Sequence, residues 1–244
     1  MNPVYLVMIG VCIISCLTMF FHMKDNTVFS SKNKLYFTLL YFCIIVVAAS
    51  EALGDWMNID GSFRTAHIIV KGIEFSLMPC LPVLMSLACE AGGHIKWAVI
   101  TLSIHAALEW LFLPFHLIIS MDSTGFYHRG PLYFIYIFID VVSLIYMLVA
   151  FSRLSGKYGT KKTATLWMIV VVMFSALIPS VISGKCHTSI LGVTLCAIIL
   201  YEYYQSLIQR ELSEKIKKQQ ESLKRLFEQT ATALVNAIDA KDKK

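Results

Sequence analysis

Residues 66–89 read AHIIVKGIEFSLMPCLPVLMSLAC, and this stretch decides the fold class. It is apolar over a length that carries an α-helix across the roughly 30 Å hydrocarbon core of a bilayer. Lys71 and Glu74 lie within it, and Pro79 and Pro82 each remove a backbone hydrogen bond. The stretch is therefore predicted to be a kinked transmembrane helix that carries charge.

The rest of the chain repeats this apolar pattern. Of the 244 residues, 57% are hydrophobic and 15% are charged, with a mean hydropathy of +0.67, which a water-soluble domain does not have. Further apolar runs of similar length lie at 3–23, 35–54, 96–119, 131–152, 164–183 and 188–208. The first run has no basic flank and no small-residue cleavage site, so we interpret it as a retained span. The sequence predicts an all-α membrane protein with a seven-helix transmembrane domain over residues 1–208.

The distribution of Lys and Arg between the loops predicts the orientation in the membrane. The loops on one side contain Lys24, Lys32, Lys34, Lys96, Arg153, Lys157, Lys161 and Lys162. Those on the other side contain only Arg64, Arg129 and Lys185. The basic side should be cytoplasmic, with the N-terminus outside and the C-terminus inside. The net charge of +5 suits anionic lipid headgroups as partners, and we expect no nucleic-acid binding.

A charged helix with a regular apolar stripe is expected after residue 208. The stripe recurs at alternating steps of 4 and 3 residues, the spacing of a coiled-coil seam. Its members are Leu212, Ile216, Gln219, Leu223, Leu226, Thr230, Ala233 and Ala237. We expect residues 209–237 to form a cytoplasmic coiled-coil linker that pairs two copies of the chain. The polar residues in the seam would allow the paired helices to switch between two ways of packing. The alternative to a coiled coil is a single amphipathic helix that lies on the membrane surface.

Ionisable residues inside the predicted spans are the candidate ligand-binding residues, because each costs about 3 kcal/mol or more within a bilayer. They are Glu51, Lys71, Glu74, His105, Glu109 and Asp140. Helical spacing puts Lys71 with Glu74, and His105 with Glu109, on shared faces. We expect a pocket that opens outward, whose excess of acids favours a cationic or hydrogen-bond-donating ligand. The alternative is that these residues pair with one another and only hold the bundle together.

No catalytic motif is recognisable in the sequence. It has no Gly-rich phosphate loop, no GxSxG, no HExxH and no His-Asp dipeptide, and its seven cysteines lack metal-ligand spacing. We therefore predict no cofactor, no metal site and no enzymatic activity for the chain as given. A small transporter or channel that uses the intramembrane acids remains the alternative function, although the sequence contains no internal repeat.

Two parts of the chain resemble known bacterial signalling proteins. Residues 226–242, LFEQTATALVNAIDAKD, resemble the helix that opens HD-GYP type cyclic-di-GMP phosphodiesterase domains. Residues 71–79, 91–93 and 126–133 resemble the seven-transmembrane sensor region that precedes histidine kinase, GGDEF and HD output domains. The resemblance implies an inner-membrane location, and that residues 238–244 are the truncated start of an output domain. The metal ligands of that family come later in its sequence, so none is carried over.

Together these features predict a membrane sensor. An extracytoplasmic or intramembrane small molecule would bind between the helices, and a dimeric helix would relay the signal to a cytoplasmic output domain. The resemblance implies that the full-length protein would be an HD-type phosphohydrolase that regulates cyclic-di-GMP.

Overall fold

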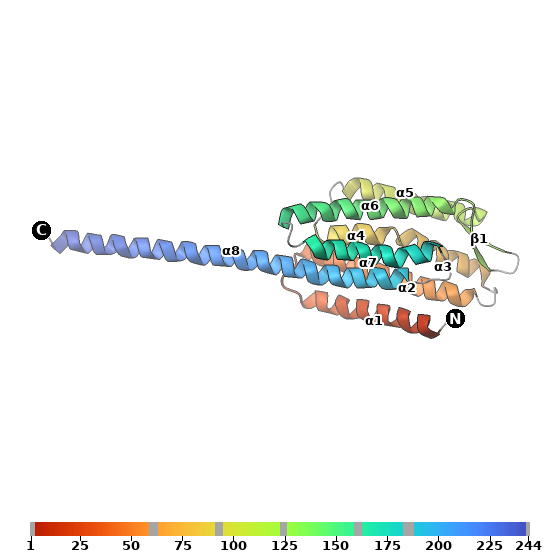
Figure 1. The fold of residues 1–244 in the computed structure, drawn as a ribbon, viewed down its shortest axis with the longest axis horizontal. Helices are drawn as coiled ribbons and strands as arrows, with labels where there is room; N and C mark the ends of the chain where they lie inside the picture. Colours follow the sequence, from red (N-terminus) through yellow and green to blue (C-terminus); the bar gives the residue numbers. More distant parts are fainter. Residues whose placement is uncertain are drawn as a thin grey trace. The chain divides into compact units, whose positions relative to one another are not determined.

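The computed structural model describes residues 3–58, 63–90, 95–122, 126–158, 163–182 and 188–242. The chain divides into two units, Met1–Glu202 and Tyr203–Lys244. The first unit is a bundle in which the helices lie side by side (Figure 1). The domain boundary expected at residue 208 stays a prediction.

The all-α membrane architecture is confirmed. The helices are α1 (Pro3–Asp25), α2 (Ser31–Met57), α3 (Arg64–Leu77), α4 (Cys80–Ala88), α5 (Ile95–Phe112), α6 (Tyr133–Tyr158), α7 (Thr163–Ile182) and α8 (Ser189–Asp242). Among the residues that the structure describes, six spans are long and apolar enough to cross a membrane, with α3 and α4 together forming one of them. The seventh helix of the bundle, α7, contains the shorter apolar stretch Ala164–Pro179. The chain is a multi-pass membrane protein.

Helix α2 supplies much of the apolar core of the bundle. Its side chains at Phe37, Leu40, Tyr41, Ile44 and Val47 are all buried, at the helical spacing of one face. The outer faces of the neighbouring helices remain apolar and exposed, as at Val7 and Val11 of α1 and Phe134 and Phe138 of α6. Such continuous exposed apolar surface is what lipid contact requires.

The fourth span is shorter than predicted. The sequence favoured one helix over 96–119, but α5 ends at Phe112 and a 3-10 turn, Leu113–Phe115, contains Pro114. The following chain forms an antiparallel hairpin of β1 (Ile119–Met121) and β2 (Tyr127–Arg129), at the right of Figure 1. The prediction was wrong because the apolar residues Ile118 and Ile119 pack into a protein core with Phe75 and Tyr136 rather than against lipid.

The kink predicted at Pro79 is confirmed as a break in the span. Helix α3 ends at Leu77 and α4 begins at Cys80. Pro79 has no N–H group, so it cannot donate to the carbonyl of Phe75 four residues earlier. That carbonyl instead lies 3.1 Å from Nε2 of His105 on α5. The broken backbone hydrogen bond is thus replaced by a side chain from another helix.

Close contacts join α8 to α7 in the first unit. A Cβ atom added at Gly192 would lie 2.1 Å from the Cβ atom of Ala176, so only glycine permits this approach of the two helices. The Thr188 hydroxyl donates to the Ala176 carbonyl at 2.8 Å. These contacts fix the start of α8 against α7.

The buried ring of Tyr201 ties α8 to the first two helices. The Asn26 side-chain amide donates to the Tyr201 hydroxyl at 2.7 Å. The rings of Phe29 and Phe37 lie 5.2 and 5.5 Å from the Tyr201 ring, both in edge-to-face geometry. The Tyr41 hydroxyl also donates to the Ala197 carbonyl at 3.4 Å. The part of α8 that belongs to the first unit is therefore held from several sides.

Candidate functional site

A buried ion pair lies in α3. The Lys71 ammonium donates to Glu74 Oε2 at 2.7 Å, and the two side chains are 9% and 10% exposed. The i,i+3 spacing puts both groups on one face of the helix. The shared face is as the sequence predicts, and the pairing of the two charges is what the alternative interpretation expected.

The facing residues of α2 bring further charge to this ion pair. A Cβ atom at Gly54 would lie 2.8 Å from Lys71 Cε, so the lysine side chain rests on the α2 backbone. Glu51 is buried one turn earlier, and Asp55 is half-buried beside Gly54. Both carboxylates lie near enough to act electrostatically on Lys71 and Glu74.

His67 completes what we call the α2–α3 polar cluster, which consists of Glu51, Asp55, His67, Lys71 and Glu74. The His67 side chain lies one turn before Lys71 and is buried, with the residue 1% exposed. Its Nε2 lies 3.6 Å from the position that a Cβ atom at Gly54 would take. Neither ring nitrogen has a hydrogen-bond partner within the described residues. A buried imidazole without a partner can bind a polar ligand or a water molecule.

The β-hairpin covers this cluster through Tyr127. The Tyr127 ring lies 5.5 Å from the Lys71 ammonium, a cation–π distance, and 6.3 Å from the His67 ring. The Tyr127 amide donates to Oδ1 of Asn58, the residue that caps α2, at 2.9 Å. Burial raises the pKa of the Tyr127 phenol, so the ring stays uncharged. The hairpin is thus attached to α2 directly over the charged residues.

The second pair of candidates lies on α5. His105 and Glu109 are the buried residues of this helix, whose apolar residues are mostly turned away from the protein. His105 Nε2 bonds to the Phe75 carbonyl and lies 3.9 Å from Glu109 Oε1, which is beyond hydrogen-bond distance. Both Glu109 oxygens lack a hydrogen-bond partner within the described residues, although the side chain is fully buried. Because α5 buries His105 and Glu109 rather than its apolar side chains, the interior of the bundle next to α5 is polar.

Aromatic rings lie between the two groups. The Phe75 ring lies 4.6 Å from that of Tyr136 and 6.2 Å from that of Tyr127. Glu109 and Glu74 are both near enough to Tyr127 to affect it electrostatically. The α2–α3 polar cluster and the His105–Glu109 pair are therefore neighbours around a shared aromatic layer.

Asp140 differs from the other candidates. It is half-buried on α6, and the Ser143 hydroxyl donates to its backbone carbonyl at 2.7 Å. The described residues give it no ion pair. The structure thus brings Glu51, Lys71 and Glu74 together and puts His105 and Glu109 beside them. Asp140 lies near enough to Tyr136 of the aromatic layer to affect it electrostatically.

Several members of the site are not among the residues predicted from the sequence. His67 lies four residues before Lys71, so the same spacing rule that paired Lys71 with Glu74 could have found it. Asp55 directly follows the predicted span 35–54, and Tyr127 lies between the predicted spans 96–119 and 131–152. Tyr127 carried no signal, because a short hairpin that folds back over a helix end is not visible in local periodicity.

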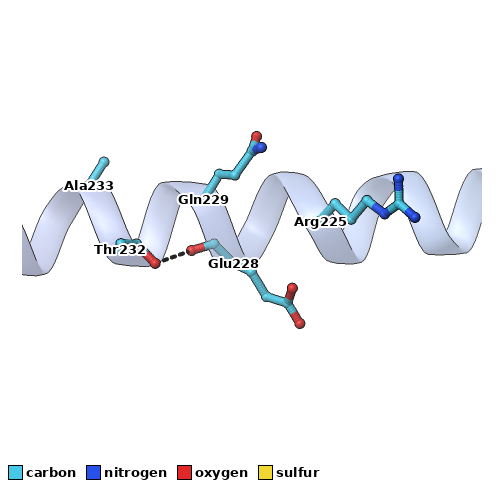
Figure 2. A pocket seen from close by; sticks show the side chains of 5 residues that line it. All are labelled: Arg225, Glu228, Gln229, Thr232 and Ala233. Carbon is cyan, nitrogen blue, oxygen red and sulfur yellow. Dashed lines mark hydrogen bonds between the residues drawn. The ribbon is translucent and has the colours of Figure 1, made fainter.

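The predicted coiled-coil seam is exposed on the second unit of the structure. Leu212, Ile216, Leu223 and Leu226 are 47% to 67% exposed, and Gln219 and Thr230 are exposed as well. Figure 2 shows five side chains of α8, from Arg225 to Ala233, around a shallow depression on the same helix. All five are exposed and come from one helix, so they do not enclose a ligand.

No protein-family model matches the sequence, and no curated protein matches it. Within the described ranges, no three His, Cys, Asp or Glu side chains are grouped so as to hold a metal ion.

Proposed function

We propose that this chain is the membrane sensor module of a bacterial signalling protein. The α2–α3 polar cluster and the His105–Glu109 pair bind a small molecule, and the bundle transmits binding to α8. The observation that carries the proposal is the buried group of charges shared by α2 and α3, in spans where each charge is costly. A bundle that needed only stability would bury apolar side chains there.

Helix α2 is the physical link from the binding residues to α8. It carries Glu51 and Gly54 near one end, and Phe37 and Tyr41, which contact α8, near the other. About 26 Å of rigid helix separates Gly54 from Phe37 at 1.5 Å per residue. A ligand that prefers one position of α2 relative to α3 would therefore also bias α8. The ligand can shift α8 only by as much as its affinities for the two positions of α2 differ.

The orientation belongs to the same proposal. The excess of Lys and Arg in alternate loops supports an inner-membrane protein with its N-terminus outside and its C-terminus in the cytoplasm. The hairpin and the α2–α3 polar cluster would then face the outside, while α8 would end in the cytoplasm. Basic side chains at the cytoplasmic side would contact anionic lipid.

In this proposal α8 carries the signal to an output domain. It is one continuous helix from Ser189 to Asp242. We propose that its seam pairs with a second copy of the chain. The Thr230 hydroxyl donates to the Leu226 carbonyl at 2.8 Å, so this polar residue can enter an apolar seam without an unpaired donor. The likeness of residues 226–242 to the opening helix of HD-GYP domains supports cyclic-di-GMP turnover as the regulated reaction.

Cysteine crosslinking in native membranes tests the relay. Single cysteines placed from Leu212 to Leu226 should crosslink between copies at the seam positions, Leu212, Ile216, Gln219, Leu223 and Leu226. Exposed positions off the seam, such as Lys218 and Glu221, serve as controls and should crosslink weakly. Uniformly absent crosslinks would reject the dimer and leave α8 as a single helix.

Transport is the second candidate, and Glu109 favours it. Glu109 is a fully buried carboxylate that has no hydrogen-bond partner among the described residues, and it lies next to a helix broken at Pro79. Such an arrangement is also found where transporters bind ions. Flux of protons or cations into proteoliposomes that Glu109→Gln abolishes would support transport over sensing.

A further inference from the structure

The Glu109 carboxyl group is buried without a group that balances a negative charge. Its side chain is 0% exposed, and neither oxygen has a hydrogen-bond partner in the part of the chain that the structure describes. Its ion-pair neighbour among these residues is His105, whose Nε2 lies 3.9 Å from Oε1, beyond hydrogen-bond distance. A buried carboxylate in such a place is costly, and the group takes up a proton instead.

His105 does not supply the missing positive charge. Its Nε2 lies 3.1 Å from the Phe75 carbonyl oxygen. Because a carbonyl oxygen only accepts, Nε2 carries a hydrogen and donates it to Phe75 rather than to Glu109. Nδ1 is buried and has no partner among the described residues, so a second hydrogen there would be unpaired. The imidazole is therefore neutral, with its hydrogen on Nε2.

The cations nearest to this pair are engaged by other groups. Helices α3 and α6 pack against α5, and Tyr127 of β2 is within electrostatic reach of Glu109. The Lys71 ammonium donates to Glu74, and Cζ of the exposed Arg129 lies 4.9 Å from the centre of the Tyr133 ring. The other titratable groups that these elements bring to the aromatic layer are His67 on α3, Tyr133, Tyr136 and Asp140 on α6, and Tyr127 on β2.

A water molecule at Glu109 would leave the charge in place. It could donate a hydrogen bond to a carboxylate oxygen, but it brings no charge to balance the anion. A proton removes the charge and turns one oxygen into a hydroxyl donor. Glu109 lies three residues before α5 ends at Phe112, about 4.5 Å along the helix axis, so a proton can exchange with solvent at the hairpin end of the bundle.

We propose that Glu109 is a proton-binding site and that the sensor reads the acidity of the solution on the hairpin side. This inference rests on the proposed sensor function and names the proton as what the His105–Glu109 pair binds. Release breaks the carboxyl O–H bond, passes the proton to water and leaves one negative charge on Glu109. That charge acts on Tyr127 together with the Glu74 carboxylate. The two carboxylates repel each other, which favours a different position of α5 relative to α3.

Infrared spectroscopy of the full chain in nanodiscs tests the proton site. A protonated carboxyl group has a C=O stretching band separate from the bands of an ionised carboxylate. At neutral pH the wild type should show a protonated-carboxyl band that Glu109→Gln removes. Glu221→Gln, on the exposed surface of α8, should keep this band. A wild type without the band, or a Glu109→Gln spectrum that loses carboxylate absorption instead, would reveal a hydrated anion and overturn the proposal.

The pH dependence of unfolding is a second readout. The folded chain holds a proton at Glu109 that the unfolded chain releases, so stability falls as the pH rises, by up to about tenfold in the unfolding equilibrium constant per pH unit. Glu109→Gln has the shape and charge of the neutral acid, so it should fold and should lose this part of the pH dependence. Failure of Glu109→Gln to fold at neutral pH, or a pH dependence equal to that of the wild type, contradicts the proposal.

Crosslinking at Leu223→Cys in membrane vesicles separates this inference from the sensor proposal. The pH on the hairpin side should change the yield in the otherwise unmodified chain but not in Glu109→Gln, which also controls for any effect of pH on the thiol. If the seam crosslinks with the same pH dependence in both, the dimeric relay stands and the inference is overturned. If the infrared band belongs to Glu109 but no seam position crosslinks, the proton site stands and the sensor proposal is wrong.

Discussion

Replacing Lys71 with methionine removes the one ammonium of the α2–α3 polar cluster. The substitution keeps the length of the side chain that rests on Gly54, but it leaves the Glu74 carboxylate buried without its partner at 2.7 Å. Breaking a buried ion pair on one side costs about 3 to 5 kcal/mol. For a chain of this size, that corresponds to a fall in Tm of roughly 6 to 20 °C.

The native cysteines provide the assay. Cys12, Cys16, Cys89 and Cys196 are fully buried, so a thiol-reactive fluorophore reports their exposure as the purified protein is heated. Lys71→Met should react at a clearly lower temperature than the wild type. The matched control is Lys96→Met, which removes an exposed lysine at the start of α5 and should change Tm little.

A double variant tests the cause of the effect. Lys71→Met with Glu74→Gln replaces both charges by neutral side chains and should recover part of the lost stability, because the uncompensated Glu74 charge is gone. If Lys71→Met were as stable as Lys96→Met, the buried ion pair would not exist as described, and the reasoning would be refuted.

Three further predictions test the contacts around the site and α8. Gly192→Ala should lower Tm more than Gly54→Ala. The new Cβ atom at residue 192 would lie 2.1 Å from the Ala176 Cβ atom between two helices, whereas the new Cβ atom at residue 54 would meet the flexible end of the Lys71 side chain. Equal effects of the two substitutions in thermal unfolding would contradict the close α7–α8 contact. His105→Ala leaves the Phe75 carbonyl and Glu109 without their neighbour, so it should lower the free energy of unfolding by about 1 to 3 kcal/mol in the same assay. An unchanged stability would show that the carbonyl freed by Pro79 does not need His105. Tyr201→Phe removes the bond from Asn26 but keeps the ring contacts, so we expect a loss of about 1 kcal/mol, while Tyr201→Ala should cost several times more.

The sequence was sufficient for the features that depend on length and helical spacing. Residues 66–89 are apolar and long enough to span, Pro79 breaks that span, and Lys71 and Glu74 meet because they are three residues apart. These results follow from local geometry, which the sequence alone determines.

Features that depend on the rotation of a helix or on a fold-back of the chain could not be predicted. Asp140 is grouped with the other acids by its depth in the membrane, but its position near Tyr133 and Tyr136 depends on the rotation of α6, which depth does not give. Ile118 and Ile119 extend an apolar run, and their burial depends on contacts with Tyr136 and Phe75 from other spans. His105 bonds to Phe75 only because two separate helices lie together.

The sidedness of the hairpin and of α8 underlies the whole proposal, and a membrane-impermeant maleimide measures it most directly. Single cysteines would replace His128, which is exposed in β2, and Leu223, which is exposed in α8, each compared with the unsubstituted chain. In intact cells we expect labelling of His128→Cys, and labelling of Leu223→Cys only after the membrane is permeabilised. Labelling of Leu223→Cys in intact cells, or of His128→Cys only after permeabilisation, would contradict an outward-facing binding site with a cytoplasmic signalling helix.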